Sequence, residues 1–131
     1  YRDEYYDLLQ RTRTEGDFEG WVEFFFTAVR ETADQAVGTA NRLLSMTAED
    51  RGRVQSLGRA AGSALRVHHA LLQRPVLTIP KIQELTGLQP NTIMSSLRRL
   101  GGLGMVKEIT GKKRDRVFGY TNYIKILNEG T

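Results

Sequence analysis

Apolar residues recur at steps of three and four through residues 18–44, which is the spacing of one face of a long α-helix. This stripe comprises Phe18, Trp21, Val22, Phe25, Val29, Ala33, Ala36, Val37, Ala40, Leu43 and Leu44. A shorter helical pattern over 2–13 precedes it, ends near Gly16 and leaves Asp17 as the expected N-cap of the long helix. We expect the stripe to be buried. If the aromatic residues of 21–26 have their partners outside this chain, they form an exposed aromatic patch instead.

A further helical pattern follows and ends before Pro75, because proline disfavours helical geometry in the preceding residue. Thr47 and Asp50 resemble a capping box with Asp in place of Glu, so a new helix is expected to begin there. Its inner face is expected to carry Val54, Leu57, Ala61, Ala64, Leu65, His68, Leu71 and Leu72. Gly58 and Gly62 lie one turn apart, and we interpret them as part of a small-residue seam that lets two helices pack closely.

Between residues 79 and 120 the apolar spacing changes from helical to alternating, and a glycine or proline stands at every change of direction. Pro80 suits the first turn of a short helix, Gly87 its left-handed end, and Pro90 the start of a second helix. The residues expected to face inward are Ile82 and Leu85 in the first helix and Ile93, Leu97 and Leu100 in the second. The remaining elements are expected to be strands at 105–109 and 116–120, a turn at 111–115, and a closing helix with Tyr123, Ile124 and Leu127.

Two helices joined by a tight turn and followed by a hairpin are typical of a winged helix-turn-helix. The predicted fold is mainly α with a small β-hairpin: a helical bundle (1–46) followed by a winged helix-turn-helix domain with its preceding long helix (47–131). Charge divides in a similar way. Residues 1–74 carry 10 Arg and 11 acidic residues, a net charge of −1, whereas residues 75–131 carry 9 Lys or Arg and 4 acidic residues, a net charge of +5. A polyanionic partner is therefore expected at the second half.

The second helix of the motif and the hairpin turn carry the residues that suit a nucleic-acid duplex. The outer face of the helix bears Asn91, Thr92, Ser95 and Arg98 with Arg99 alongside, and the hairpin bears Lys112, Lys113, Arg114 and Arg116. The helix side chains can hydrogen-bond to base edges or phosphates, and the cations of the hairpin suit a phosphate backbone. Two other interpretations stay open. The polar residues can simply be solvated, and many winged helices dock proteins rather than DNA.

The sequence offers no catalytic, metal or cofactor site that we recognise. It contains no cysteine, and its two histidines, His68 and His69, are adjacent, so they point about 100° apart on a helix and suit a structural role better than one metal. The Gly102–Gly104 segment lies between a helix and a strand, which is the reverse of the order in a dinucleotide-binding loop. No apolar run is long enough to span a membrane, and we expect a cytoplasmic protein without a membrane partner.

Two long segments resemble a known family. YRDEYYDLLQRTRTEGDFEGWVEFFFTAV resembles the last helices of a Fic-type domain, the fold that transfers AMP from ATP to protein hydroxyls. The segment from QRPVLTIPKI to GYTNYIKILNEGT resembles the C-terminal winged-helix extension of many bacterial Fic proteins. The family's catalytic loop, HPFxxGNGR, has no counterpart here, and its inhibitory motif is not recognisable. The resemblance implies a non-catalytic C-terminal part of a Fic-type protein adenylyltransferase, with the rest of that parent protein as its partner.

Two hypotheses for function follow. In the first, the winged helix binds duplex DNA and has a transcriptional or autoregulatory role. In the second, the chain is a protein–protein or dimerisation module that regulates or positions the missing Fic catalytic domain. A second copy of the chain, forming a homodimer, is one candidate partner in this hypothesis. The aromatic cluster of residues 21–26 and the small-residue seam of residues 58–64 motivate the second hypothesis. Neither hypothesis assigns a cofactor to the chain.

Overall fold

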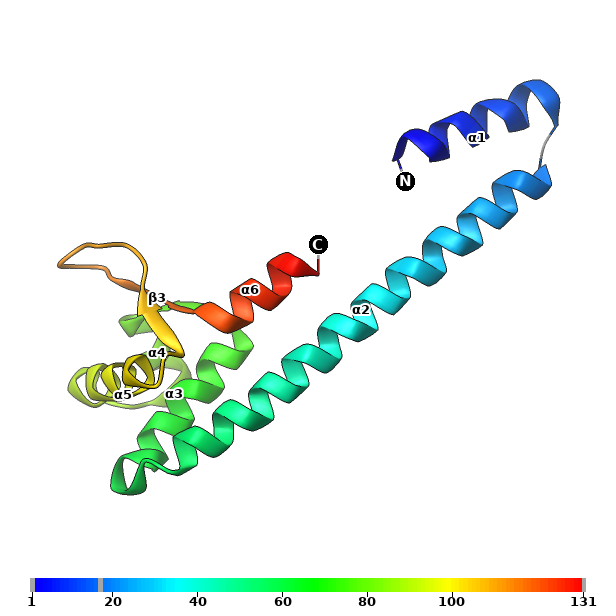
Figure 1. The fold of residues 1–131 in the computed structure, drawn as a ribbon. Coiled ribbons are helices and arrows are strands. Elements are labelled where there is room, and N and C mark those ends of the chain that lie inside the picture. Colours follow the sequence, from blue (N-terminus) through cyan, green and yellow to red (C-terminus); the bar gives the residue numbers. More distant parts are fainter. Residues whose placement is uncertain (1, 17, 131) are drawn as a thin grey trace. The chain divides into compact units, whose positions relative to one another are not determined.

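The computed structural model describes residues 2–16 and 18–130 of the 131-residue chain (Figure 1). Its elements are α1 (Arg2–Glu15), α2 (Phe18–Gln55), a 3-10 turn (Gly58–Ala60), α3 (Ala61–Gln73), β1 (Val76–Thr78), α4 (Ile79–Thr86), α5 (Pro90–Gly102), β2 (Val106–Glu108), β3 (Val117–Tyr120) and α6 (Thr121–Glu129). The predicted fold class is confirmed: the chain is mainly helical and carries a small antiparallel sheet. The expected N-cap, Asp17, lies outside the described residues.

The chain divides into two compact units, Tyr1–Ala40 and Asn41–Thr131. In the second unit, α3 packs against both α4 and α5, α4 packs against α5, and the sheet contacts α4, α5 and α6. This is the arrangement of a winged helix-turn-helix, in which α4 and α5 form the helix pair and the loop between β2 and β3 is the wing. The buried core lies among these elements and the end of α2, and comprises Met46, Val54, Ala64, Val67, Ala70, Leu71, Leu77, Ile82, Ile93, Leu97, Leu100, Met105, Val106, Phe118, Tyr120 and Ile126.

The sheet has three strands in the order β1-β3-β2, and both pairs are antiparallel. Val76 pairs with Gly119, and Val106 pairs with Tyr120. The sequence pattern predicts the hairpin of β2 and β3 but no strand at β1. A three-residue strand leaves almost no periodic signal, and its pairing with β3 joins positions about 40 residues apart in the chain.

Local signals in the sequence set the ends of the two helices of the motif. The Thr78 hydroxyl accepts a hydrogen bond from the Lys81 amide at 3.3 Å and caps the start of α4. Gly87 ends α4 at φ +72°, and its amide donates to the Gln83 carbonyl at 2.8 Å. Pro90 begins α5, as predicted. One expectation for α4 is wrong: Leu85 was expected to face inward, but its side chain is 41% exposed.

The predicted helix start at Thr47 is also wrong, because α2 runs without a break from Phe18 to Gln55. The Thr47 hydroxyl donates to the Leu43 carbonyl at 2.7 Å, which is a bond within a continuing helix rather than an N-cap. The helix ends instead before Gly58, whose φ of +71° favours glycine. A methyl group on Gly58 or Gly62 would meet no heavy atom within 4 Å, so these glycines do not form a helix-packing seam.

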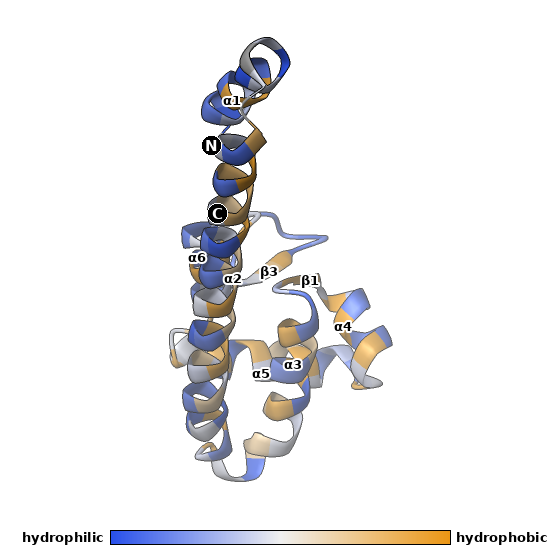
Figure 2. Cartoon of the chain, turned by 90° about the vertical axis from the view of Figure 1, so that its right-hand side faces the viewer, coloured by the Kyte–Doolittle hydropathy of each residue, from blue (hydrophilic) through white to orange (hydrophobic). Residues whose placement is uncertain are grey.

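The first unit differs from the expectation of a buried stripe. None of its described residues, 2–16 and 18–40, is buried wherever a side-chain exposure is given. Phe18 is 66% exposed and Phe26 is 64% exposed, although apolar residues recur along this part of α2 as predicted (orange in Figure 2). The spacing therefore predicts the helix, but within the first unit the stripe packs only in part, against α1.

Candidate nucleic-acid interface

The middle of the outer face of α5 carries three of the predicted site residues. Each residue of an α-helix turns about 100° from the one before. The buried positions Ile93, Leu97 and Leu100 therefore lie on one side of α5 and leave another side to face away from the core. Asn91, Ser95 and Arg98 lie on that other side, and all three are exposed.

One edge of this face adjoins the wing. Met94 of α5 lines a hollow together with Pro80 of α4 and with Lys113, Asp115 and Arg116 of the wing. In Figure 1 the loop between β2 and β3 extends to the same side of the second unit as α5. The outer face of α5 and the basic wing are thus neighbouring parts of one accessible surface, with the half-buried Met94 side chain between them.

The other edge of the face adjoins the start of α3. Thr92 and Arg99 line a second hollow with Ala60 and Ser63, and Asn91 and Ser95 reach into the same hollow. Arg99 is exposed, whereas Thr92 is half-buried. The five predicted residues of α5 therefore share its outer surface, but Thr92 and Arg99 lie at the edge toward α3 rather than at the edge that carries Met94.

Hydrogen bonds to the Glu108 side chain fix the base of the wing. The Glu108 carboxylate accepts hydrogen bonds from the Thr110 hydroxyl, from the Thr110 amide at 3.2 Å and from the Gly111 amide at 2.9 Å. These bonds, the Thr110 hydroxyl first among them, lower the pKa of Glu108. Gly111 adopts φ +65° and Asp115 adopts φ +53°, so the chain reverses through two left-handed positions. The tip of the wing is consequently an ordered turn that begins at a fixed carboxylate.

The cations of the wing face solvent. Lys112, Lys113 and Arg114 are exposed, and Arg116 is half-buried with its Nε donating to the Lys112 carbonyl at 3.0 Å. Over residues 2–16 and 18–130, no ion pair engages these four side chains or Arg98. Their charge is therefore not neutralised by a salt bridge within the described chain, and it can act on an external anion.

A buried network of polar side chains, which the sequence pattern does not predict, connects β3 to α2 and α3. The Tyr120 hydroxyl of β3 donates to the Asp50 carboxylate of α2 at 2.5 Å and lies 2.9 Å from Nε2 of His68 on α3. Because the hydroxyl hydrogen is engaged by Asp50, Nε2 of His68 carries the hydrogen of the second bond. All three residues are buried. The network ties β3, and with it the wing, to α2 and to α3, the helix that packs against α5.

The network also changes the ionisation of its members. Burial lowers the pKa of His68, and the positive charge of Arg51 adds to this effect, while the Asp50 carboxylate opposes it. Burial and the bond to Asp50 raise the pKa of Tyr120. His68 is therefore a neutral side chain at physiological pH, and its bond to Tyr120 gives it the structural role expected from the sequence.

Within the part of the chain that the structure describes, no group of three or more His, Cys, Asp or Glu residues is placed to hold a metal ion. Among residues 2–16 and 18–130, no helix combines the length and the apolar character needed to cross a bilayer.

Comparison with known proteins adds little to this geometry. No protein-family model and no curated protein matches the chain. Three solved structures share part of its fold. BpsR from Bordetella bronchiseptica, whose DNA binding is regulated by 6-hydroxynicotinic acid, matches with a TM-score of 0.44 and 14% identity over 69% of this chain and 74% of its own. Rv1404 from Mycobacterium tuberculosis matches with a TM-score of 0.45 and 15% identity over 78% of this chain and 73% of its own.

The third structure, AbfR in a disulfide-formed state, matches with a TM-score of 0.44 and 17% identity over 83% of this chain and 82% of its own. Such low identities and TM-scores carry no argument about function. The comparisons do bear on the predicted relationship to Fic-type proteins. None of the three structures is a Fic protein, and no sequence match supports a relationship to that family. The comparisons contradict that relationship, and with it the implied adenylyltransferase parent and catalytic partner domain.

Proposed function

We propose that the second unit binds duplex DNA, with α5 in the major groove and the wing along the phosphate backbone. The observation that carries the proposal is the shared surface: the outer face of α5 continues through Met94 to Lys113 and Arg116. Asn91, Ser95 and Arg98 are the candidates for contact with base edges, and Thr92 and Arg99 for contact with phosphates or flanking bases.

Electrostatics support the same surface. Residues 41–131 carry 15 Lys or Arg against 6 acidic residues, a net charge of +9, whereas residues 1–40 have a net charge of −5. The cations Lys112, Lys113 and Arg114 are exposed at the wing tip, where a phosphate backbone can approach them. Through duplex binding, the chain would act as a non-enzymatic regulator, either of transcription or of its own expression.

Selection from a pool of random-sequence duplexes tests this proposal. The 131-residue chain is expected to enrich a preferred sequence, and Ser95→Ala or Arg98→Gln is expected to shift that preference by about 1–3 kcal/mol at the contacted base. Lys113→Gln is expected to weaken binding to all duplexes alike, and Lys125→Gln, an exposed cation on α6, serves as the matched control. No retention of any duplex at low salt would contradict the proposal.

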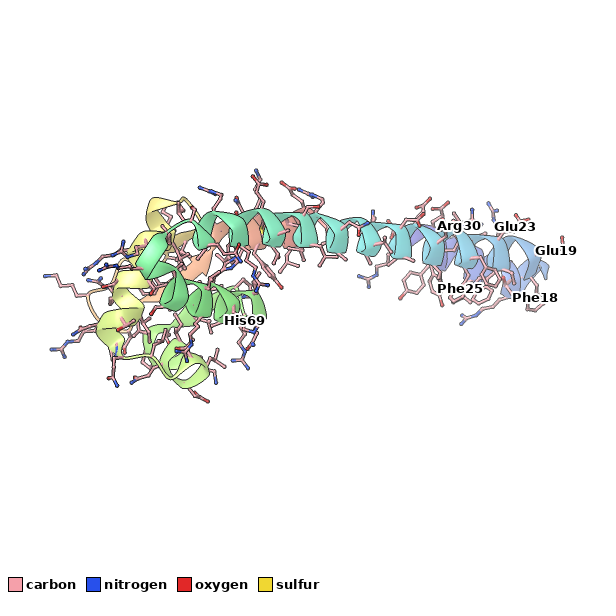
Figure 3. The ribbon with its side chains drawn as sticks, turned by 90° about the horizontal axis from the view of Figure 1, so that it is seen from below. Phe18, Glu19, Glu23, Phe25, Arg30 and His69 are labelled. Carbon is pink, nitrogen blue, oxygen red and sulfur yellow. The ribbon has the colours of Figure 1, made fainter. Side chains whose placement is uncertain are left out.

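A second function is favoured by a separate observation, the exposed apolar side of the first unit. Phe18 and Phe25 lie on one side of α2, while Glu23 and Arg30 lie on the opposite side (Figure 3). Trp21 stacks on Phe25 with ring centroids 5.5 Å apart, and its Nε1 is the one buried side-chain nitrogen or oxygen of the described residues that has no hydrogen-bond partner. We propose that this side packs against a second copy of the chain, since two such helix pairs can form a four-helix bundle.

Sedimentation of the 131-residue chain tests the second proposal. The wild type is expected to be a dimer, and Phe25→Glu is expected to give a monomer because it places a charge in the apolar interface. Glu23→Gln, on the opposite side of α2, is expected to leave the dimer intact. A wild-type chain that stays monomeric at high concentration would refute self-association.

A further inference from the structure

The second unit contains a cleft that the proposed DNA-binding surface does not use. It is bounded by α2, α3 and the end of α4, and it has a volume of about 370 Å³. The residues that line it are Thr47, Arg51, Leu65, Arg66, His68, His69, Leu72, Leu85 and Thr86. A cleft of this size falls within the range of small-molecule sites.

The lining of the cleft divides into an apolar wall and a cationic rim. Leu65, Leu72 and Leu85 supply apolar surface, and the 41% exposure of Leu85 is explained by its place in this lining. Arg51 and Arg66 are both exposed and are the permanently charged groups of the lining, which contains no carboxylate. The residues around the cleft thus favour a ligand that is negatively charged at one end and apolar at the other.

The hydroxyl groups in the cleft are already engaged as donors. The Thr47 hydroxyl donates to the Leu43 carbonyl, and the Thr86 hydroxyl donates to the Ile82 carbonyl at 2.7 Å. His68 donates to Tyr120, as described above. An anion in the cleft must therefore be held chiefly by the guanidinium groups. His69 of α3 (Figure 3) also lines the cleft, but its Nε2 already pairs with the side-chain amide of Gln73 at 3.3 Å.

One of the two guanidinium groups is held in place by the helix-turn-helix itself. A terminal nitrogen of Arg66 donates to the carbonyl of Thr86, the last residue of α4. A guanidinium has five N–H donors, so the remaining donors can bind a carboxylate in its planar, two-pronged geometry. A fixed guanidinium loses less side-chain entropy on binding than a free one.

From this arrangement we infer that the cleft between α2, α3 and α4 is a binding site for a small carboxylate that carries an apolar group. Its carboxylate binds Arg51 and Arg66, and its apolar group, for which the benzene ring of benzoate serves as the probe, packs against Leu65, Leu72 and Leu85. The inference goes beyond the proposed DNA binding and does not depend on it, because the cleft can be tested with no DNA present.

Titration of the 131-residue chain with three probes, followed by NMR amide shifts, tests the site. Benzoate is expected to bind with a dissociation constant of about 1 mM, with the largest shifts at residues of the cleft. Benzamide has the same ring without the charge, and acetate has the charge without the ring. Each is expected to bind at least about tenfold more weakly than benzoate.

Variants separate the site from non-specific attraction of an anion to a basic protein. Arg51→Gln and Arg66→Gln are each expected to weaken benzoate binding about tenfold, whereas Arg59→Gln, a surface arginine outside the cleft, is expected to leave it unchanged. Arg51→Gln remains informative even if loss of the Arg66 contact disturbs the end of α4. The inference is overturned if benzoate causes no saturable shift at the cleft, if benzamide binds equally well, or if Arg51→Gln has no more effect than Arg59→Gln.

Discussion

The two units of this chain share an apolar spacing typical of helices but differ in what their apolar residues contact. In residues 41–131, helices and sheet enclose a core in which Val54, Val67 and Leu71 have no exposed surface. In the described part of residues 1–40, no side chain of known exposure is buried, and Phe18 and Phe26 remain mostly exposed. The second unit contains its own partners, whereas the first is a pair of helices too small to enclose a core.

The difference teaches that a helical stripe predicts an apolar contact but not the identity of the contacting surface. A single pair of helices can bury only the strip between them: the rings of Tyr5 and Phe24 lie 6.4 Å apart across α1 and α2 and are half-buried, whereas Val29 is 50% exposed. A third layer is needed to cover the rest. The stability of the second unit is therefore expected to depend on its own core, and that of the first unit on a further surface that covers it. Substitution at matched positions in the two units can measure this difference.

The largest difference is expected for one substitution made in both units. Val67 on α3 is fully buried, whereas Val37 on α2 is 59% exposed. Val67→Ala is expected to lower the free energy of unfolding by about 2–3 kcal/mol, because it removes buried methyl groups and leaves a cavity. Val37→Ala is expected to change it by less than about 0.5 kcal/mol in dilute solution. Urea denaturation checks both. Equal losses would mean that the first unit has a closed core after all.

A smaller effect is expected from the buried polar network of Asp50, Tyr120 and His68 in the second unit. The described residues of the first unit have no such network. Tyr120→Phe removes the donor to Asp50 and the acceptor of His68, and is expected to cost about 1–2 kcal/mol because both groups stay buried. Tyr123→Phe, a half-buried ring on α6, is the matched control and is expected to cost less than about 0.5 kcal/mol. Thermal unfolding measures the pair. If Tyr120→Phe were as mild as the control, the network would not stabilise the fold.

The smallest expected effect is a pH dependence of stability that arises from His68. Its pKa is lowered in the folded state, chiefly by burial, from an unfolded value near 6.5. As the pH falls below about 6.5, the unfolded chain binds a proton that the folded chain does not, so stability decreases toward the lowered pKa. Urea denaturation at a series of pH values is expected to show this loss in the wild type and in His69→Gln. In His68→Gln the loss should be smaller, and an unchanged pH dependence there would assign it to other groups.

The helix-turn-helix could be predicted closely because its boundaries are set by single residues. Gly87 supplies the left-handed end of α4, Pro90 starts α5, and the spacing of Ile93, Leu97 and Leu100 fixes the inner face. The outer face then follows from helical geometry alone. These features are local, so the sequence carries them in full.

The features that could not be predicted depend on contacts between distant residues. Tyr120 and Asp50 are 70 positions apart, and no period in the sequence links them. Thr47 and Asp50 have the spacing of a helix start, but Met46, Asp50 and Val54 are buried inside the second unit, and this packing keeps α2 continuous through them. Leu85 fits an inward position by spacing, yet it lies over the cleft, where the fold leaves a gap beside α4.

The salt dependence of duplex binding tests the central claim, that α5 and the wing form one DNA-binding surface, most directly. The affinity of the 131-residue chain for its selected duplex is measured between about 50 and 200 mM salt, for the wild type and for Lys112→Gln/Lys113→Gln. The account predicts that this double substitution reduces the slope of log affinity against log salt by about 1.8, since each phosphate contact contributes about 0.9. Arg74→Gln/Lys125→Gln, which removes two exposed cations elsewhere in the second unit, should leave the slope unchanged. Equal slopes for the wild type and the wing variant would contradict the account.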